Sequence, residues 1–181
     1  DIGASTGGFT DCMLQNGADK VYAVDVGHGQ LAQKLIDDTR VVNLEGLNVK
    51  DLICDTLESE VDFVASDLSF ISCKYAIEAA SRILKDGGQA VILIKPQFEV
   101  GKSGISKGGI VKDKKQHVLA ITALLESLAD SDMKPAKLIP SPIKGGDGNI
   151  EYLILLVKSI NFMQKSFDIK SMVDAAFASA K

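Results

Sequence analysis

The sequence has 181 residues, of which 46% are hydrophobic and 24% charged, which is typical of one globular domain with a substantial core. The net charge of −4 argues against a general affinity for nucleic acid, unless a local basic patch or a further domain supplies one. Three cysteines without a C-x-x-C pair and two histidines without ligand spacing exclude a disulfide framework and a metal centre built from these residues. The cysteines fit free thiols in a reducing cytoplasm, so we expect a cytoplasmic protein. The longest apolar runs, residues 152–157 and 90–94, are too short to span a bilayer.

The chain opens with a glycine-rich stretch, Asp-Ile-Gly-Ala-Ser-Thr-Gly-Gly-Phe-Thr-Asp, that leads directly into a helical pattern. A tight glycine turn between a strand and a helix N-terminus is typical of nucleotide sites in α/β proteins. The spacing G-x-x-x-G-G does not match the dinucleotide fingerprint, and no Gly-Lys-Ser/Thr follows. An acid at position 1 suits the cationic head of S-adenosylmethionine better than a pyrophosphate. An ordinary glycine-rich turn is the alternative.

Further along the chain, apolar runs predict strands, and apolar residues at a 3.6-residue period predict the helices between them. The predicted strands lie at residues 20–26, 40–44, 61–66, 89–94, 137–140 and 151–158. The predicted helices lie at residues 9–16, 31–36, 72–84 (stopped by Gly87-Gly88), after the N-cap Asp113, and at 168–180. Residue 1 reads as the end of an earlier strand, so we expect the chain to be part of a longer protein. The alternation predicts a doubly wound sheet with helices on both faces, in which the last strand inserts antiparallel after a glycine turn.

Candidate cofactor residues come from the opening turn and from two later loops. Asp25 ends a strand about twenty residues after the first glycine, where an acid binds ribose hydroxyls in doubly wound folds; it is otherwise a turn residue before Gly27. Residues of the next loop could flank an adenine ring. The full set is Asp1, Gly3, Ala4, Ser5, Thr6, Gly7, Gly8, Phe9, Asp25, Val26, Asn48, Val49 and Asp67.

Three ionisable residues stand at strand ends: Asp67, Lys95 and Glu151. If the last strand is antiparallel, all three meet at the edge of the sheet where ligands bind. Unpaired charges there would be costly, so we expect them to pair with one another. Such a lysine can take the proton from a hydroxyl as a methyl group arrives. A purely structural ion pair is the alternative.

One basic patch interrupts the acidic chain. Residues 96–112 read as a long glycine-rich loop, which in a compact domain is often functional. Six lysines against Glu99 and Asp113 give residues 95–115 a local charge of 6 − 2 = +4. A solvated connector is an equal alternative. Within this patch, Lys102, Lys107 and Lys112 are candidates for contacts with phosphate groups.

Five motifs in order resemble the TlyA family, in which hemolysin-labelled proteins are ribosomal RNA 2′-O-methyltransferases with an FtsJ-like catalytic domain. They are the opening stretch, Ala-Val-Asp-Val-Gly-His-Gly-Gln-Leu, Ser-Asp-Leu-Ser-Phe-Ile-Ser, Lys-Pro-Gln-Phe-Glu-Val-Gly-Lys and Gly-Asn-Ile-Glu-Tyr. The resemblance covers essentially the whole chain. One departure is Glu-Gly-Leu-Asn at residues 45–48, where relatives tend to have Glu-Arg-Thr-Asn, which puts a role of that loop in doubt.

The resemblance implies an S-adenosylmethionine-dependent methyltransferase fold, Rossmann-like, with seven strands and the seventh antiparallel. It implies a Lys–Asp–Lys–Glu tetrad of which Asp67, Lys95 and Glu151 are the last three members; the first lysine and an S4-like RNA-binding domain would precede residue 1. Residues 1–181 would then be the methyltransferase domain, with ribosomal RNA or ribosomal subunits as partner and the oligomeric state open.

Three other functions are weighed against this one. A membrane-lytic hemolysin needs an insertion-prone segment, and only the C-terminal helix could touch a bilayer. An amino-group methyltransferase usually carries Asn/Asp-Pro-Pro-Tyr/Phe, whereas Asp-Leu-Ser-Phe stands at residues 67–70. A non-catalytic RNA-binding or assembly module would be favoured by loss of catalytic residues, and three of the four are present.

Overall fold

The computed structural model describes residues 1–101, 104, 106, 108–159, 161 and 165–179. In this part of the chain the strands are β1 (Val21–Asp25), β2 (Val41–Glu45), β3 (Val61–Ser66), β4 (Leu84–Ile94), β5 (Met133–Pro140) and β6 (Tyr152–Lys158). The helices are α1 (Gly8–Gln15), α2 (Gln33–Ile36), α3 (Lys74–Ile83), α4 (Pro96–Glu99), α5 (Lys114–Ser127) and α6 (Ile169–Ser179), with 3₁₀ turns at Val49–Asp51 and Cys54–Thr56.

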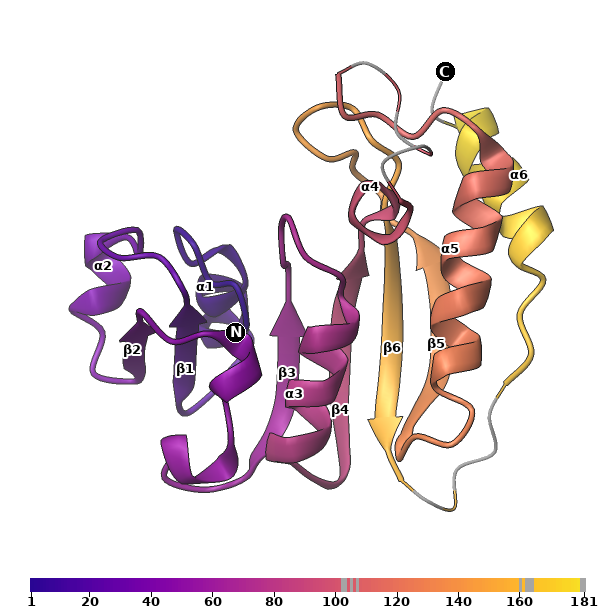
Figure 1. The fold of residues 1–181 in the computed structure, drawn as a ribbon. Coiled ribbons are helices and arrows are strands. Elements are labelled where there is room, and N and C mark those ends of the chain that lie inside the picture. The colour runs from indigo at the N-terminus through magenta and orange to yellow at the C-terminus, as the bar shows by residue number, and fades with distance from the viewer. Residues whose placement is uncertain (102–103, 105, 107, 160, 162–164, 180–181) are drawn as a thin grey trace.

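The strands lie side by side in the order β2, β1, β3, β4, β6, β5 (Figure 1). The pairs β1–β2 and β3–β4 are parallel, whereas β6 is antiparallel to both β4 and β5. The predicted antiparallel insertion of the last strand is therefore confirmed. Its register pairs Ile94 with Tyr152, which brings the end of β4 and the start of β6 to the same edge.

The expected seven-stranded sheet is only partly present. The strands form a two-stranded and a four-stranded sheet, and Ile2 lies between them, with single parallel bridges to Val24 and Ser66. Ile2 is 2% exposed, and its N–H donates to Ala65 O. The strand predicted at the start of the chain is thus one bridging residue between β1 and β3.

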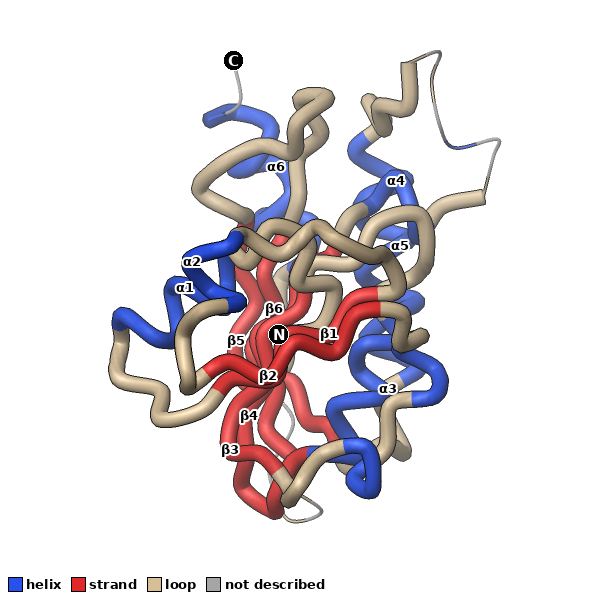
Figure 2. The backbone as a smooth tube through the Cα atoms, turned by 90° about the vertical axis from the view of Figure 1, so that its left-hand side faces the viewer, coloured by secondary structure: helices blue, strands red, loops and turns tan. Residues whose placement is uncertain are grey.

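Helices cover the sheet from both sides, as predicted. Figure 2 shows α1 and α2 on one side of the strands and α3, α4 and α5 on the other. The apolar stripe of α3 (Ala76, Ile77, Ala80 and Ile83) is buried against β3 and β4. Helix α6 packs against α5 and β5 at the edge of the sheet.

Two boundaries differ from the sequence prediction. Helix α3 ends at Ile83, and β4 begins directly at Leu84, so Gly87-Gly88 lies within a strand instead of stopping the helix. The segment after β4 is not loop throughout, because α4 forms its first turn with Pro96 at the first helical position, where proline needs no N–H partner. This turn places four side chains beside the end of β4.

Candidate functional site

A cleft of about 970 Å³ lies beyond the carboxyl ends of the parallel strands, where α/β folds bind their ligands. Its walls come from the opening turn, the segment after β3, α4 and the loop before β6. The lining residues are Asp1, Gly3, Ala4, Ser5, Thr6, Gly8, Phe9, Cys12, Asp67, Ser69, Phe70, Leu93, Lys95, Gln97, Phe98, Gly109, residues 141–147, Glu151 and Leu153.

Lys95 and Asp67 form an ion pair in this cleft. The Nζ atom of Lys95 lies 2.6 Å from Asp67 Oδ1 and donates a hydrogen bond of 3.0 Å to Ser69 Oγ. The Lys95 side chain is 12% exposed, whereas that of Asp67 is 43% exposed. The aliphatic stem is thus enclosed while the charged end reaches the cleft. The predicted contact between these two residues is confirmed.

Glu151 precedes β6 and lies in the same cleft, 6% exposed. Burial raises the pKa of its carboxyl group, and the hydrogen bond from Gln97 and the positive charge of Lys95 act in the opposite direction. Its Oε1 accepts a 3.0 Å hydrogen bond from Gln97 Nε2. Among the described residues, no ion pair joins Glu151 to Lys95. The expected three-way pairing is therefore a direct Lys95–Asp67 pair with Glu151 held beside it by an amide.

The glycines of the opening turn have different structural roles. Gly7 has φ +95°, and a Cβ there would lie 2.1 Å from Leu35 Cδ1, so this glycine permits close packing of α2. Gly3 has φ +82°, and a Cβ there would lie 2.9 Å from Asp67 O. Gly8, in contrast, faces open space on the cleft side. The opening turn is thus closely packed at Gly3 and Gly7, and at Gly8 it is open to the cleft.

Asp1 carries an unused acceptor at the same turn. Its Oδ2 accepts hydrogen bonds from the N–H and the hydroxyl of Thr10, at 2.8 and 2.7 Å. Its Oδ1 is buried and has no hydrogen-bond partner in the described part of the chain. Because an unsatisfied buried carboxylate oxygen is costly, this atom marks a place for a donor supplied by a ligand.

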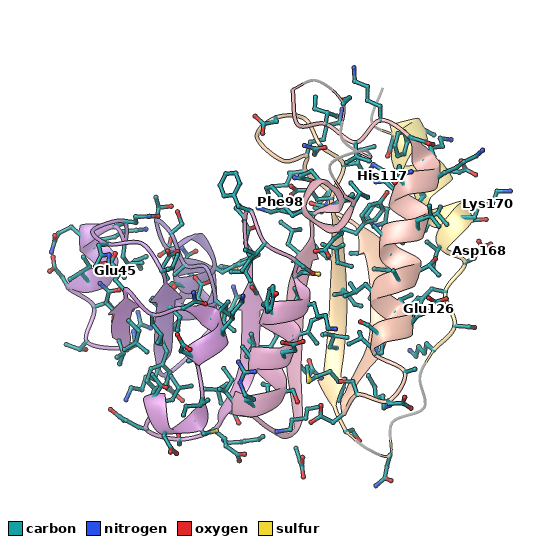
Figure 3. The ribbon with its side chains drawn as sticks, in the orientation of Figure 1. Glu45, Phe98, His117, Glu126, Asp168 and Lys170 are labelled. Carbon is teal, nitrogen blue, oxygen red and sulfur yellow. The ribbon has the colours of Figure 1, made fainter. Side chains whose placement is uncertain are left out.

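Backbone strain also concentrates at the cleft. Among the described non-glycine residues only Ser5 (φ 48°) and Phe70 (φ 68°) have positive φ, and both line it. A bulky residue in this region is a true outlier, and such outliers cluster at ligand sites. Phe70 is 87% exposed, and its ring centroid lies 5.2 Å from that of Phe98. Figure 3 shows Phe98 at α4, beside the ends of the strands.

Five predicted cofactor residues do not line the cleft, and Gly7, which packs against Leu35, is the first of them. Asp25 accepts hydrogen bonds from the N–H groups of Ser5 and Gly27, at 2.8 Å each, and so ties two loops together. Val26 is 65% exposed. Asn48 caps the following 3₁₀ turn by accepting from Lys50 N, and Val49 is buried in the core.

The RNA-contact candidates cannot all be placed. Lys102 and Lys107 lie outside the described residues. Lys112 is exposed, but it lines a separate groove between α5 and α6 together with Lys115 and Lys170. Lys112, the described member of these three candidates, therefore lies outside the cleft.

A buried polar network behind the cleft was not predicted. Asn149 accepts from Val111 N and donates to Gly109 O, at 3.1 Å each, which joins the loop after α4 to the loop before β6. His117, fully buried, lies 3.0 Å from the Tyr152 hydroxyl and 2.9 Å from Val111 O. Burial lowers the pKa of His117, so the neutral ring is favoured. Asn149 and Tyr152 belong to the Gly-Asn-Ile-Glu-Tyr motif that contains Glu151. Membership of this motif was the only feature of the sequence that could have pointed to the network.

Other features of the described residues bear on the remaining alternatives. Within them, no helix is both long enough and apolar enough to cross a membrane. The same residues contain no cluster of three or more His, Cys, Asp or Glu side chains that could hold a metal ion.

The fold and the cleft define an α/β methyltransferase, and the comparisons agree. A family model described as FtsJ-like methyltransferase matches residues 1–158, so the chain belongs to the FtsJ-like methyltransferase family. More distant solved methyltransferases share the fold alone.

The chain is 46% identical over 154 residues to hemolysin A of Brachyspira hyodysenteriae, a match that covers 84% of this chain and 64% of that protein. It is 40% identical over 156 residues to the 16S/23S rRNA (cytidine-2′-O)-methyltransferase TlyA of Mycobacterium tuberculosis, covering 86% of this chain and 58% of that protein. A solved structure of a protein named as a hemolysin from Streptococcus thermophilus superposes with a TM-score of 0.92 at 44% identity, covering 98% and 65% of the two chains. The chain thus spans between 56% and 64% of the length of the first three curated relatives.

Proposed function

We propose that this chain is the catalytic part of an S-adenosylmethionine-dependent methyltransferase that modifies ribose 2′-hydroxyls of ribosomal RNA. The observation that carries the proposal is the Lys95–Asp67 ion pair of 2.6 Å, which lies in the same cleft as the open glycine turn. The name of the mycobacterial relative supports the choice of ribosomal RNA and of the 2′-oxygen.

The residues of the opening turn fit the proposed cofactor. The unpartnered Oδ1 of Asp1 suits an ammonium group, and the open face of Gly8 leaves room for a ligand at the start of α1. Ser5, Thr6 and Phe9 line the same wall. When bound, S-adenosylmethionine supplies an electrophilic methyl group on a sulfonium. Asp25 would influence the cofactor indirectly, by accepting a hydrogen bond from the N–H of Ser5 and so fixing the position of that residue.

Lys95 is the proposed acceptor of the proton from the 2′-hydroxyl. Asp67 and Ser69 both contact its Nζ atom and so fix its position. To act as the base, the Lys95 amine must first release its own proton to solvent. The neutral amine can then remove the hydroxyl proton as the oxygen–methyl bond forms, and the Asp67 carboxylate stabilises the ammonium that results. Glu151 lies in the same cleft, where the positive charge of Lys95 acts to lower the pKa that burial raises. Beyond this, the chain contributes by positioning the reactants.

Phe70 is the proposed platform for a base of the RNA. An exposed aromatic ring at the cleft is costly in water but suits stacking with a nucleobase. Phe98 supports the ring from the side of α4. Lys112 is a proposed contact for phosphates farther along the strand.

The proposed function is tested by incubating the protein with radiolabelled S-adenosylmethionine and ribosomal subunits that lack the modification. A 2′-O-methyl group makes the adjacent phosphodiester resistant to alkali, because the 2′-hydroxyl that attacks it is blocked. Label in alkali-resistant dinucleotides is the expected result. Label only in alkali-labile mononucleotides would indicate base methylation, and leakage of liposomes without methyl transfer would indicate a lytic protein.

A further inference from the structure

The single turn of α4 brings several chemically distinct groups to the cleft. Lys95 is its N-cap residue, and Gln97 and Phe98 line the cleft from it. Glu99 fixes the turn by accepting from Ser72 Oγ and Cys73 N, at 2.7 Å each. Gln97 therefore stands on an anchored turn, next to the lysine that is the proposed proton acceptor.

The amide of Gln97 has a defined orientation. A carboxylate only accepts hydrogen bonds, so the Nε2 group of Gln97 faces Glu151 Oε1, at 3.0 Å. The carbonyl oxygen must then face the other way. This Oε1 atom is buried and has no hydrogen-bond partner within the described ranges.

The surroundings restrict what can satisfy this oxygen. Glu151 is itself enclosed, since a Cβ on Gly145 would lie 2.5 Å from its Oε1, so the amide cannot easily turn around it. A buried carbonyl without a partner is destabilising unless a donor reaches it. The space next to Gln97 that a donor could enter is the cleft, which Lys95 and Glu151 also line.

We propose that Gln97 is a substrate-positioning residue, whose carbonyl oxygen accepts a hydrogen bond from an O–H or N–H group of the target nucleotide while its amide nitrogen holds Glu151. The inference rests on the proposed function and extends it to a residue outside the expected Asp67–Lys95–Glu151 set. It assigns the donor to the nucleotide and not to the cofactor, because Gln97 contacts Glu151, whereas the unpartnered Oδ1 of Asp1 lies at the opening turn. The third such oxygen among the described residues, Asp67 Oδ1, lies 2.6 Å from Lys95 Nζ.

The test compares Gln97→Met with the wild-type full chain. Methionine has a similar length and cannot accept or donate a comparable hydrogen bond. We expect kcat/KM for unmodified ribosomal subunits to fall about tenfold, as for the loss of one hydrogen bond that is made on binding. The Kd for S-adenosylhomocysteine, measured by calorimetry, is expected to stay within about twofold. Gln89→Met, at an exposed glutamine of β4 away from the cleft, is the matched control.

The possible results distinguish a failure of the proposed role of Gln97 from a failure of the proposed methyltransferase function. An unchanged kcat/KM in Gln97→Met overturns the inference, and so does an equal loss of S-adenosylhomocysteine affinity, which would assign the donor to the cofactor. If Gln97→Met does not fold, Gln97→Ala, which only truncates the side chain, provides the same comparison. Absence of methyl transfer in the wild-type protein would count against the proposed function, and is recognised before any variant is compared.

Discussion

The Nζ atom of Lys95 lies 2.6 Å from Asp67 Oδ1, and the two residues follow neighbouring parallel strands. Strands β3 and β4 pair in register up to Ser66 and Ile92, so the residues just beyond them emerge at the same edge. The contact is therefore a consequence of strand pairing. It is also the relationship on which the proposed chemistry depends.

Replacing Phe70 by alanine is expected to weaken RNA binding and leave the fold intact. Its ring is 87% exposed, so the free energy of unfolding should change by no more than about 0.5 kcal/mol. Loss of base stacking should weaken binding by about 1–3 kcal/mol. Filter binding to ribosomal subunits and urea unfolding measure the two quantities. Ile36→Ala, at an apolar residue 42% exposed that lines neither the cleft nor the groove of Lys112, is the control, and equal RNA affinity in both variants would contradict the stacking role.

The pH dependence of stability should reveal the buried carboxyl of Glu151. Its pKa is raised above the usual 4.5, mainly by burial, so the folded state binds the proton more tightly than the unfolded state. Its contribution to stability therefore falls as pH rises from that usual value through the raised pKa. Glu151→Gln should remove this dependence and raise Tm at neutral pH while lowering methyl transfer. A lower Tm for the variant at neutral pH would show that the ionised carboxylate is stabilising.

Glu45 should behave in the opposite way. Its carboxylate accepts backbone hydrogen bonds from Gly29, Gln30 and Leu31, which lower its pKa to about 2. Its stabilising effect is complete above the usual pKa of 4.5 and is lost as pH falls toward about 2. Glu45→Gln should therefore have a lower Tm than the wild type at neutral pH, and the difference should narrow in acid. A difference that is constant with pH would contradict this account.

Asn149 should hold together two walls of the cleft. Asn149→Ala leaves the buried N–H of Val111 without its partner, so the free energy of unfolding should fall by about 1–3 kcal/mol. Amide hydrogen exchange at residues 108–111 should become faster, as measured by mass spectrometry. Asn161→Ala, at an exposed asparagine, is the control. Unchanged exchange at residues 108–111 would show that the loop is held by other contacts.

Local patterns in the sequence predicted the elements better than the contacts between them. The strand at Val61–Ser66 and the N-cap role of Asp113 were predicted as found, because apolar runs and capping residues act locally. The turn α4 was missed, although a proline at its first position was a usable signal. Ile2 is a single bridging residue, which no pattern of its own could indicate.

Site residues that stand at the ends of strands could be predicted from the sequence. Site residues whose hydrogen-bond partners lie far along the chain could not. Asp67, Lys95 and Glu151 were expected to meet because they stand at one edge of the sheet. The roles of Gln97 and Asn149 depend on single hydrogen bonds to residues far along the chain, which a linear pattern does not encode. Gly7 was expected to let a ligand or a neighbouring backbone come close, and in the structure the Leu35 side chain packs against it.

The most direct test of the proposed function is the rate of methyl transfer to unmodified ribosomal subunits by Lys95→Ala, measured beside its affinity for S-adenosylhomocysteine. Removing the proton acceptor should lower the rate by about 100-fold or more and leave the affinity nearly unchanged. Lys85→Ala, at an exposed lysine of β4, the strand that Lys95 follows, is the matched control and should keep the wild-type rate. A wild-type rate in Lys95→Ala would contradict the assignment of this cleft as the catalytic centre.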